Sequence, residues 1–307
     1  MVTTLSHRRW ALALLVVAAA ASGSAALLLA TPSGPDLTRL PLGDRKLTTT
    51  PKSGYVMRCV SGNAGIGGAS KDGPWIDTAA GTFDITKKAT VDGAISWPAR
   101  RFVVRVIGGK RRVQTADLPA HTTGRFPIAA NDDAYQFDQN PNRISGQNIT
   151  LVLSSKPRPA ATASCVQMGP IGVLLTGVLI YDALDAGGRD AVAHEVQDHC
   201  DGHPDPSSSY HYHSLTRCLR VSEGLVGYAL DGFGIYGPRE GGRTLTTRDL
   251  DACHGRTSVV TWGGRSVRMY HYVATADFPY TVSCFKGTPV RTRIGAPPGG
   301  GPPPGQP

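Results

Sequence analysis

Short apolar runs separated by glycine, proline, asparagine and serine dominate the middle of the chain. The clearest are 101–107 (RFVVRVI), 149–153 (ITLVL) and 257–262 (TSVVTW). Each is short, rich in β-branched residues and bounded by turn residues, which is typical of β-strands. Only 188–197 and 247–252 have the composition of helices, and both are short. The pattern predicts a mainly β, sandwich-like fold with few short helices.

The N-terminus has the layout of a targeting segment. In residues 1–30, Arg8 and Arg9 precede an uncharged apolar run, and small residues around 21–26 offer a cleavage site. This arrangement predicts a signal peptide. Because the run approaches the ~20 residues that span a bilayer, retention as a membrane anchor is the alternative.

Proline and glycine then delimit the folded part. Residues 31–53 are rich in Pro, Thr and Gly without apolar periodicity, which predicts a flexible linker. Residues 289–307 are dominated by Gly and Pro and predict a disordered tail. A single folded domain is therefore expected over 54–288.

The second half of the chain contains an internal duplication. The segment 172–181 (GVLLTGVLIY) aligns with 227–236 (GYALDGFGIY) at an offset of 55 residues. Each copy continues with an Asp-x-Cys-x-Gly element and a Tyr-His-Tyr element, and each closes with a cysteine. The repeat predicts two related β units, about 170–218 and 225–284.

Composition and charge narrow the class of protein. The chain has 40% hydrophobic and 18% charged residues with 37 Gly and 23 Pro, which argues against a coiled coil and against a wholly disordered chain. The net charge of +9 is spread along the sequence, whereas nucleic-acid binding needs a concentrated basic face. The one short cluster, Lys110 to Arg112, follows two glycines and indicates a solvated hairpin turn. No nucleic-acid partner is expected.

The six cysteines all lie beyond the targeting segment, and an even number in an exported chain predicts disulfide bonds. Six cysteines allow fifteen pairings. The repeat favours one bond within each unit and leaves one bond between the two remaining cysteines: Cys200 with Cys218, Cys253 with Cys284, and Cys59 with Cys165. The expected location is secreted or extracytoplasmic, with membrane contact only if the N-terminal segment is retained.

Several motifs together resemble the YHYH-domain family of exported bacterial and eukaryotic proteins, whose function is uncharacterised. They are the Tyr-His-Tyr-His run at 210–213, and 138–142 (DQNPN), 198–204 (DHCDGHP), 230–238 (LDGFGIYGP) and 278–285 (FPYTVSCF). The resemblance spans roughly 54–287. It implies no particular reaction, so the chemistry has to be argued from the residues.

Histidines supply the candidate chemistry, since seven of the nine fall between His194 and His271. Imidazole is a common ligand of transition metals. In a strand, side chains alternate between faces, so His211 and His213 would share one face. The repeat makes His211 and His271 equivalent, and a pseudo-symmetric pairing of the units would bring them together. The sequence therefore predicts a copper or zinc site drawn from His203, His211, His213, His254 and His271.

Familiar catalytic motifs are absent from the sequence. His194 and His199 are five residues apart, whereas the metalloprotease helix needs two histidines four residues apart. A cupin-type His-x-His would be followed by a glutamate, which is missing after His213. No Gly-x-Ser-x-Gly elbow of a serine hydrolase occurs.

Acidic and amide side chains give two secondary candidates. An oxygen-rich loop could bind calcium, although the same residues favour ordinary turns: Asp132, Asp133, Asp138, Asn140 and Asn142. Asp231, beside Gly232, predicts a hairpin turn but remains a possible site carboxylate.

Two classes of function remain open. The first is an exported protein with a His-rich metal site, which would perform metal-assisted hydrolysis or oxidation on an unknown extracellular substrate. The alternative is a non-catalytic binding module of the cell envelope, whose Tyr/His cluster is structural and whose Trp75, Trp97 and Trp262 contact a glycan or partner.

Overall fold

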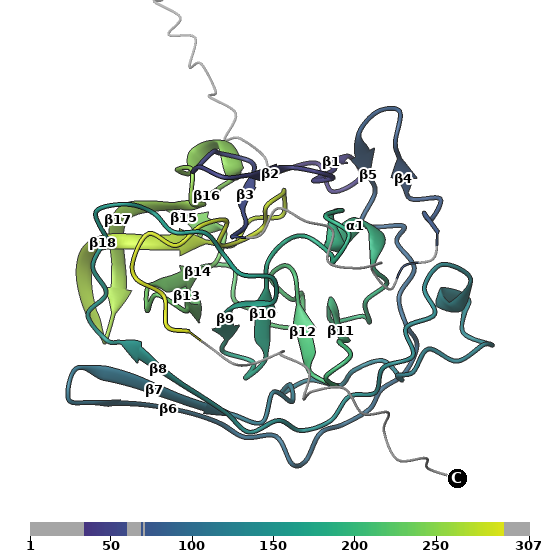
Figure 1. The fold of residues 1–307 in the computed structure, drawn as a ribbon, viewed down its shortest axis with the longest axis horizontal. Coiled ribbons are helices and arrows are strands. Elements are labelled where there is room, and N and C mark those ends of the chain that lie inside the picture. The colour runs from purple at the N-terminus through teal and green to yellow at the C-terminus, as the bar shows by residue number, and fades with distance from the viewer. Residues whose placement is uncertain (1–33, 60–68, 70, 292–307) are drawn as a thin grey trace, which may run out of the picture. The chain divides into compact units, whose positions relative to one another are not determined.

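Strands make up most of the regular structure in residues 34–59, 69 and 71–291, which are the residues that the computed structural model describes (Figure 1). The predicted mainly β, sandwich-like fold is confirmed. The predicted signal peptide or anchor and nearly all of the C-terminal tail lie outside the described residues. Among the described residues, no helix is long and apolar enough to cross a membrane.

An eight-stranded mixed sheet forms the centre of the domain, in the order β11-β12-β10-β9-β13-β14-β18-β17. This order is symmetric about its middle, because β9 to β12 are the first repeat unit and their counterparts in the second unit follow in reverse. At the centre, Val173 pairs with Tyr228, its own equivalent at the offset of 55. The strands are β9 (Pro170–Leu174), β10 (Leu179–Tyr181), β11 (Gly202–Pro204), β12 (Tyr210–Tyr212), β13 (Leu225–Ala229), β14 (Gly234–Tyr236), β17 (Gly255–Trp262) and β18 (Arg265–Val273).

Two equivalent glycines permit the close approach of the two units. A Cβ atom on Gly172 would lie 2.6 Å from the carbonyl oxygen of Tyr228, and one on Gly227 would lie 2.6 Å from that of Val173. Real Cβ atoms do not approach backbone oxygens so closely. The glycines that align in the sequence repeat therefore stand at the pseudo-twofold axis of the sheet.

A second sheet, in the order β6-β7-β8, packs against the first. Its strands are β6 (Phe102–Ile107), β7 (Lys110–Thr115) and β8 (Ile149–Ser154). Its inward side chains, such as Val113 and Leu151, join the same core as Val173 of the central sheet. At the contact, the buried Asp117 accepts a hydrogen bond of 2.9 Å from the backbone N–H of Leu179.

Smaller elements complete the domain. Three small sheets are formed by β1 (Leu40–Pro41) with β5 (Thr82–Phe83) and β4 (Ile76–Asp77), by β2 (Leu47–Thr48) with β3 (Val56–Met57), and by β15 (Arg239–Glu240) with β16 (Arg243–Thr244). The helical segments are α1 (Ala191–His194) and the 3₁₀ turns η1 (Asp133–Gln136) and η2 (Thr247–Asp249). The helices expected at 188–197 and 247–252 thus shrink to single turns.

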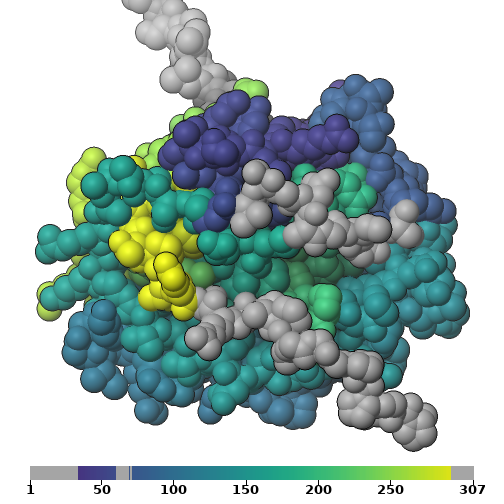
Figure 2. All heavy atoms as spheres, in the orientation of Figure 1, coloured from purple at the N-terminus to yellow at the C-terminus, as the bar shows by residue number. Residues whose placement is uncertain are grey.

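Part of the segment expected to be a linker is packed on the domain. Leu40 and Leu42 belong to the hydrophobic core, and Figure 2 shows the described N-terminal residues, in purple, lying against the rest of the molecule. The apolar sequence Leu-Pro-Leu, set among polar residues, explains this packing, because burial of each leucine stabilises the folded state by about 2 kcal/mol.

The three disulfides are the ones that the repeat favoured. Cys59 bonds to Cys165, Cys200 to Cys218 and Cys253 to Cys284, and no cysteine is free. Three disulfides indicate an oxidising environment outside the cytoplasm.

Candidate metal centre

The Tyr-His-Tyr-His run forms β12 and the residue after it, and its side chains alternate as predicted. His211 and His213 face each other, with 3.1 Å between their Nε2 atoms. Tyr210 and Tyr212 point to the opposite face, where they are fully buried in the core. The motif therefore places its histidines on one side of the strand and its tyrosines on the other.

The neighbouring strand β11 adds a third imidazole. His203 pairs directly with His211 across the antiparallel β11–β12 ladder, so the two side chains share a face. The ring centre of His203 lies 4.5 Å from that of His211 and 5.5 Å from that of His213. One ligand nitrogen from each of the three lies within 4.8 Å of the others, and all three side chains are buried.

Backbone carbonyls fix the tautomers of two of these rings. Nδ1 of His211 lies 3.3 Å from the carbonyl oxygen of Ser209, and Nδ1 of His213 lies 2.5 Å from that of Asp182. A carbonyl only accepts, so both Nδ1 atoms carry the hydrogen, as in many metal-bound histidines. In the neutral rings the two Nε2 lone pairs then face each other, and a proton or a metal ion between them would relieve their repulsion.

Glu195, at the end of α1, contributes a carboxylate that the sequence did not single out. Its Oε2 lies 3.2 Å from Nε2 of His213 and 3.4 Å from Nε2 of His203, although neither contact has the geometry of a hydrogen bond. The chain is held there because Asp138 accepts a hydrogen bond of 2.9 Å from the N–H of Val196. The carboxylate reaches the site from outside the strands that carry the histidines.

Glu195 could not be recognised from the sequence, because the His194–His199 pattern that contains it lacks the spacing of a metalloprotease helix. Neither flanking histidine enters the site: His194 contacts Asp44 and Asp72, and His199 contacts Thr122. Glu195 turns toward the cluster alone, because the chain leaves helical geometry at this residue. Only its position three residues before the Asp198 motif could have suggested it.

Burial leaves several polar atoms of the cluster without partners. Both ring nitrogens of His203 and Oε2 of Glu195 are buried and make no hydrogen bond within the described part of the chain. Burial holds the pKa of His203 and of His211 well below the usual value. Burial also lowers the pKa of His213, but Glu195 and Asp182 together outweigh burial, so that this pKa is raised.

The spacing of these atoms suits a metal ion. Four ligands at 2.0–2.1 Å in a tetrahedron stand about 3.3 Å apart. Three of the six separations between these donor atoms, 3.1, 3.2 and 3.4 Å, are close to that edge length, and the nitrogens of the three imidazoles lie within 4.8 Å of one another. Three imidazoles and one carboxylate are a donor set that zinc and copper accept.

A cavity of about 590 Å³ adjoins the cluster. Tyr181 forms part of its wall and stacks on His211, with ring centres 3.9 Å apart, while its hydroxyl donates to Asp205 at 2.8 Å. The volume is within the range of small-molecule sites. The lining includes His203, His211, His213, Glu195, Met168, Leu184, Asn140 and Asn142.

His254 and His271 do not join the cluster. His211 on β12 and His271 on β18 are separated by five strand spacings in the sheet, or about 24 Å. The expected convergence of the two units does not occur, because the pseudo-twofold axis runs through the middle of the sheet and sends equivalent strands to opposite ends. His254 is buried and its Nε2 lies 3.0 Å from the hydroxyl of Thr275.

The second unit keeps only one of the three imidazoles. Arg256 pairs with His271 in the ladder, as His203 pairs with His211, and Val273 replaces His213. Arg256 in turn lies 3.3 Å from the carboxylate of Glu240. At this end of the sheet, a guanidinium takes the place of the third histidine.

The oxygen-bearing candidates take structural positions. Asp231 lies in the β13–β14 turn, where it accepts hydrogen bonds from the Tyr272 hydroxyl at 2.6 Å and from the N–H of Gly287 at 2.9 Å, and burial raises its pKa. In the loop considered for calcium, Asp132 and Asp138 accept hydrogen bonds from backbone N–H groups. These are the interactions of ordinary turns.

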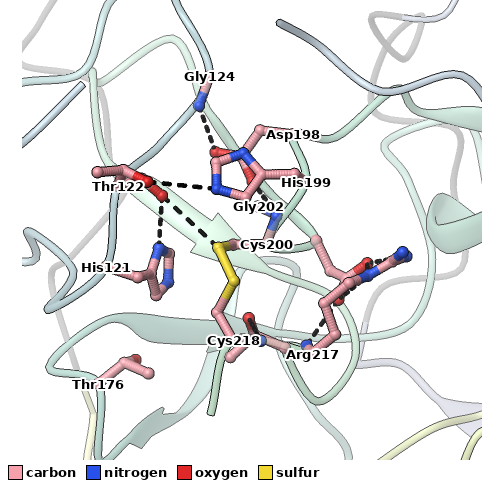
Figure 3. The surroundings of a disulfide bond; sticks show 12 residues. His121, Thr122, Gly124, Thr176, Asp198, His199, Cys200, Gly202, Arg217 and Cys218 are labelled. Atoms are coloured by element: carbon pink, nitrogen blue, oxygen red, sulfur yellow. Dashed lines mark hydrogen bonds and ion pairs between the residues drawn. A yellow bond between two sulfur atoms is a disulfide. The ribbon is translucent and has the colours of Figure 1, made fainter. Parts of the chain in front are cut away.

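The Cys200–Cys218 disulfide closes a loop that contains β11, β12 and all three clustered histidines. Figure 3 shows the disulfide with His121 beside it and His199 above, both directed toward Thr122. His121 lies close to both sulfur atoms, but these are bonded to each other.

Residues 150–244, about a third of the chain, match the family model described as YHYH protein. No curated protein and no solved structure matched the chain. The matched segment runs from β8 to β16 and includes the three clustered histidines and Glu195, whereas His254 and His271 follow it. The resemblance seen in the sequence is confirmed over residues 150–244, which match the YHYH family.

Proposed function

We propose that this is an exported metalloprotein whose YHYH domain binds one transition metal ion, zinc or copper. The imidazoles of His203, His211 and His213 are the ligands, and Glu195 is either the fourth ligand or a proton acceptor beside the ion. Export accords with the targeting segment in the sequence and with three disulfides.

One observation carries this proposal: the buried polar atoms that face one another without partners. A proton on His213 would supply a single cation and relieve the contact with His211 or with Glu195. It would leave both nitrogens of the buried His203 unpaired, and each such group costs about 1–3 kcal/mol. A metal ion would give a partner to one nitrogen of each of the three imidazoles and to Oε2 of Glu195 at once.

The cavity beside the cluster supports a catalytic role for the ion. A zinc ion held by three imidazoles lowers the pKa of a bound water to about 7 and polarises carbonyl groups. Glu195 is placed to take up a proton at its Oε2, which lies beside two of the imidazoles. Tyr181 and the two asparagines of the wall are available to orient a ligand. This arrangement suits hydrolysis or oxidation of a small molecule or an exposed chain segment.

Metal content of purified protein tests the proposal. The wild type, stripped and reloaded with zinc or copper, should hold one equivalent, and His211→Gln with His213→Gln should hold almost none while remaining folded. His271→Gln is the matched control, because it removes the equivalent histidine of the second unit. Equal occupancy in the wild type and the double variant would contradict the proposal and favour the structural alternative for the Tyr/His cluster.

A single further variant separates the two roles of Glu195. If Glu195 is a proton acceptor, Glu195→Gln should retain one equivalent of metal at nearly wild-type affinity. If it is the fourth ligand, the affinity should fall by at least tenfold.

A further inference from the structure

The positive charge of this protein is concentrated in three segments that the fold gathers at one end. Residues 93–116, 139–181 and 252–276 contain twelve Lys and Arg residues and no Asp or Glu. These segments are far apart in the linear sequence, so the positive charge is spread along the chain. In the structure they supply the sheet of β6, β7 and β8 and the β17–β18 hairpin.

The β6–β7 hairpin presents a basic and aliphatic face. Across the ladder, Arg105 lies opposite Arg112, and Arg112 lies opposite Val152 on β8, so the three side chains share one face. In the next row toward the turn, Ile107 lies opposite Lys110 on that same face. All five side chains are exposed.

The turn itself carries unusually exposed aliphatic residues. Val106 is 60% and Ile107 is 68% exposed, directly before the Gly108–Gly109 turn. Of the six large hydrophobic side chains that are exposed in the described residues, four lie on the β6–β7–β8 sheet or the β17–β18 hairpin. Exposed apolar groups that are gathered in this way mark an interaction surface.

The second hairpin lies beside the first. The Arg111 guanidinium lies 4.3 Å from the ring centre of Trp262, and the indole N–H of Trp262 donates to the carbonyl oxygen of Ser155 at 3.2 Å. Trp262 ends β17 and pairs with Arg265 across the Gly263–Gly264 turn. In Figure 1 both turns lie at the left end of the molecule.

The charges at this end are not neutralised within the protein. Ten exposed cationic side chains of these segments have no carboxylate partner among the described residues: Arg100, Arg101, Arg105, Lys110, Arg112, Arg143, Lys156, Arg158, Arg265 and Arg268. The carboxylates that line a pocket with Val259 to Thr261 on β17 are Glu223 and Glu240, and Glu240 is paired with Arg256. Segments that supply free cations and no acids of their own attract a polyanionic surface.

We propose that this end of the molecule docks on an anionic phospholipid membrane, with Val106 and Ile107 at the β6–β7 turn entering the headgroup region and the surrounding Arg and Lys side chains contacting lipid phosphates. The aliphatic turn favours a bilayer over a soluble polyanion, because only the bilayer offers a hydrocarbon layer in which Val106 and Ile107 are buried. This docking is independent of the N-terminal segment and of the metal centre.

Vesicle sedimentation tests the docking surface. The purified chain should bind phosphatidylcholine vesicles that contain half phosphatidylglycerol and should bind pure phosphatidylcholine vesicles far more weakly, and added salt should weaken the binding. Each removed cation is expected to lower the affinity about fivefold, so Arg105→Gln, Lys110→Gln and Arg112→Gln together should lower it roughly 100-fold. All variants keep the same N-terminal segment, so any contribution of that segment to vesicle binding is the same in each of them.

Two further variants show whether this surface binds a lipid bilayer or a soluble polyanion. Val106→Ser with Ile107→Ser should lower vesicle affinity at least tenfold without changing net charge. The matched control, Arg39→Gln, Lys52→Gln and Lys87→Gln, removes three exposed cations outside the acid-free segments and should lower affinity less than threefold. Unchanged vesicle affinity in the serine variant, with tight binding to soluble heparin, would overturn the lipid proposal in favour of a polyanion. An equal loss of vesicle affinity in the control variant would show that binding depends only on net charge, and it would overturn the proposed docking surface.

Discussion

The disulfide Cys200–Cys218 should control the affinity of the metal centre, because it closes the loop that carries His203, His211 and His213. The perturbation is the double variant Cys200→Ser, Cys218→Ser. Opening a loop of 18 residues raises the conformational entropy of the unfolded chain, which stabilises the unfolded state by about 3 kcal/mol. We expect the free energy of unfolding to fall by about that amount.

The matched control is the equivalent disulfide of the second unit. Cys253→Ser with Cys284→Ser opens a loop of 31 residues, which should lower the free energy of unfolding by about 4 kcal/mol. That loop carries none of the three clustered histidines. If the first loop loosens locally in its variant, metal binding has to order it again, and the affinity can fall by up to about 3 kcal/mol, or roughly 100-fold. The control variant should keep wild-type affinity despite its larger loss of stability.

Competition with a chromophoric chelator measures zinc affinity in both variants, and thermal unfolding without metal measures their stability. The variant with the smaller loss of stability should show the larger loss of zinc affinity. An equal loss of zinc affinity in the two variants, or wild-type zinc affinity in the Cys200–Cys218 variant, would refute this role of the disulfide.

Three other predictions test the fold and the metal centre. Burial lowers the pKa of His254 to about 3, below its value near 6.5 in the unfolded chain, so the unfolded state binds more protons between these pH values. Stability should therefore fall as the pH drops from 6.5 toward 3, by up to about 1.4 kcal/mol per pH unit, and urea unfolding of His254→Asn should show a correspondingly smaller slope; identical slopes would contradict this assignment. Gly227→Ala should destabilise by about 2–4 kcal/mol because its Cβ would meet a carbonyl oxygen at 2.6 Å, whereas Gly146→Ala, with its nearest neighbour at 3.4 Å, should cost under about 1 kcal/mol in the same denaturation assay. Arg256→His with Val273→His rebuilds the three-histidine pattern in the second unit, and it should raise bound zinc from one to two equivalents; an unchanged single equivalent would show that the units differ in more than these side chains.

Local periodicity accounts for what the sequence could predict. Alternation in a strand placed His211 and His213 on one face, and the repeat correctly paired Cys200 with Cys218 and Cys253 with Cys284. Such features depend on neighbours in the chain or on copies of the same pattern. They follow from residue order alone.

Features that depend on how the units are placed could not be predicted in the same way. The repeat made His211 and His271 equivalent, but it could not tell whether the symmetry axis would bring them together or set them at opposite ends of one sheet. Glu195 reaches the cluster through the turn after α1, which Asp138 holds from a distant loop. The basic face likewise depends on contacts between hairpins that are far apart in the sequence.

The location of a bound ion tests the central claim most directly. Crystals grown with zinc, measured on both sides of the zinc absorption edge, give an anomalous difference map that locates the metal without assumptions about its ligands. The account predicts one strong peak about 2.0–2.1 Å from a ring nitrogen of His203 and from Nε2 of His211 and of His213, with the Glu195 carboxylate beside it. A crystal whose map has no peak among these three imidazoles, or whose only peaks lie at other histidines, would contradict it.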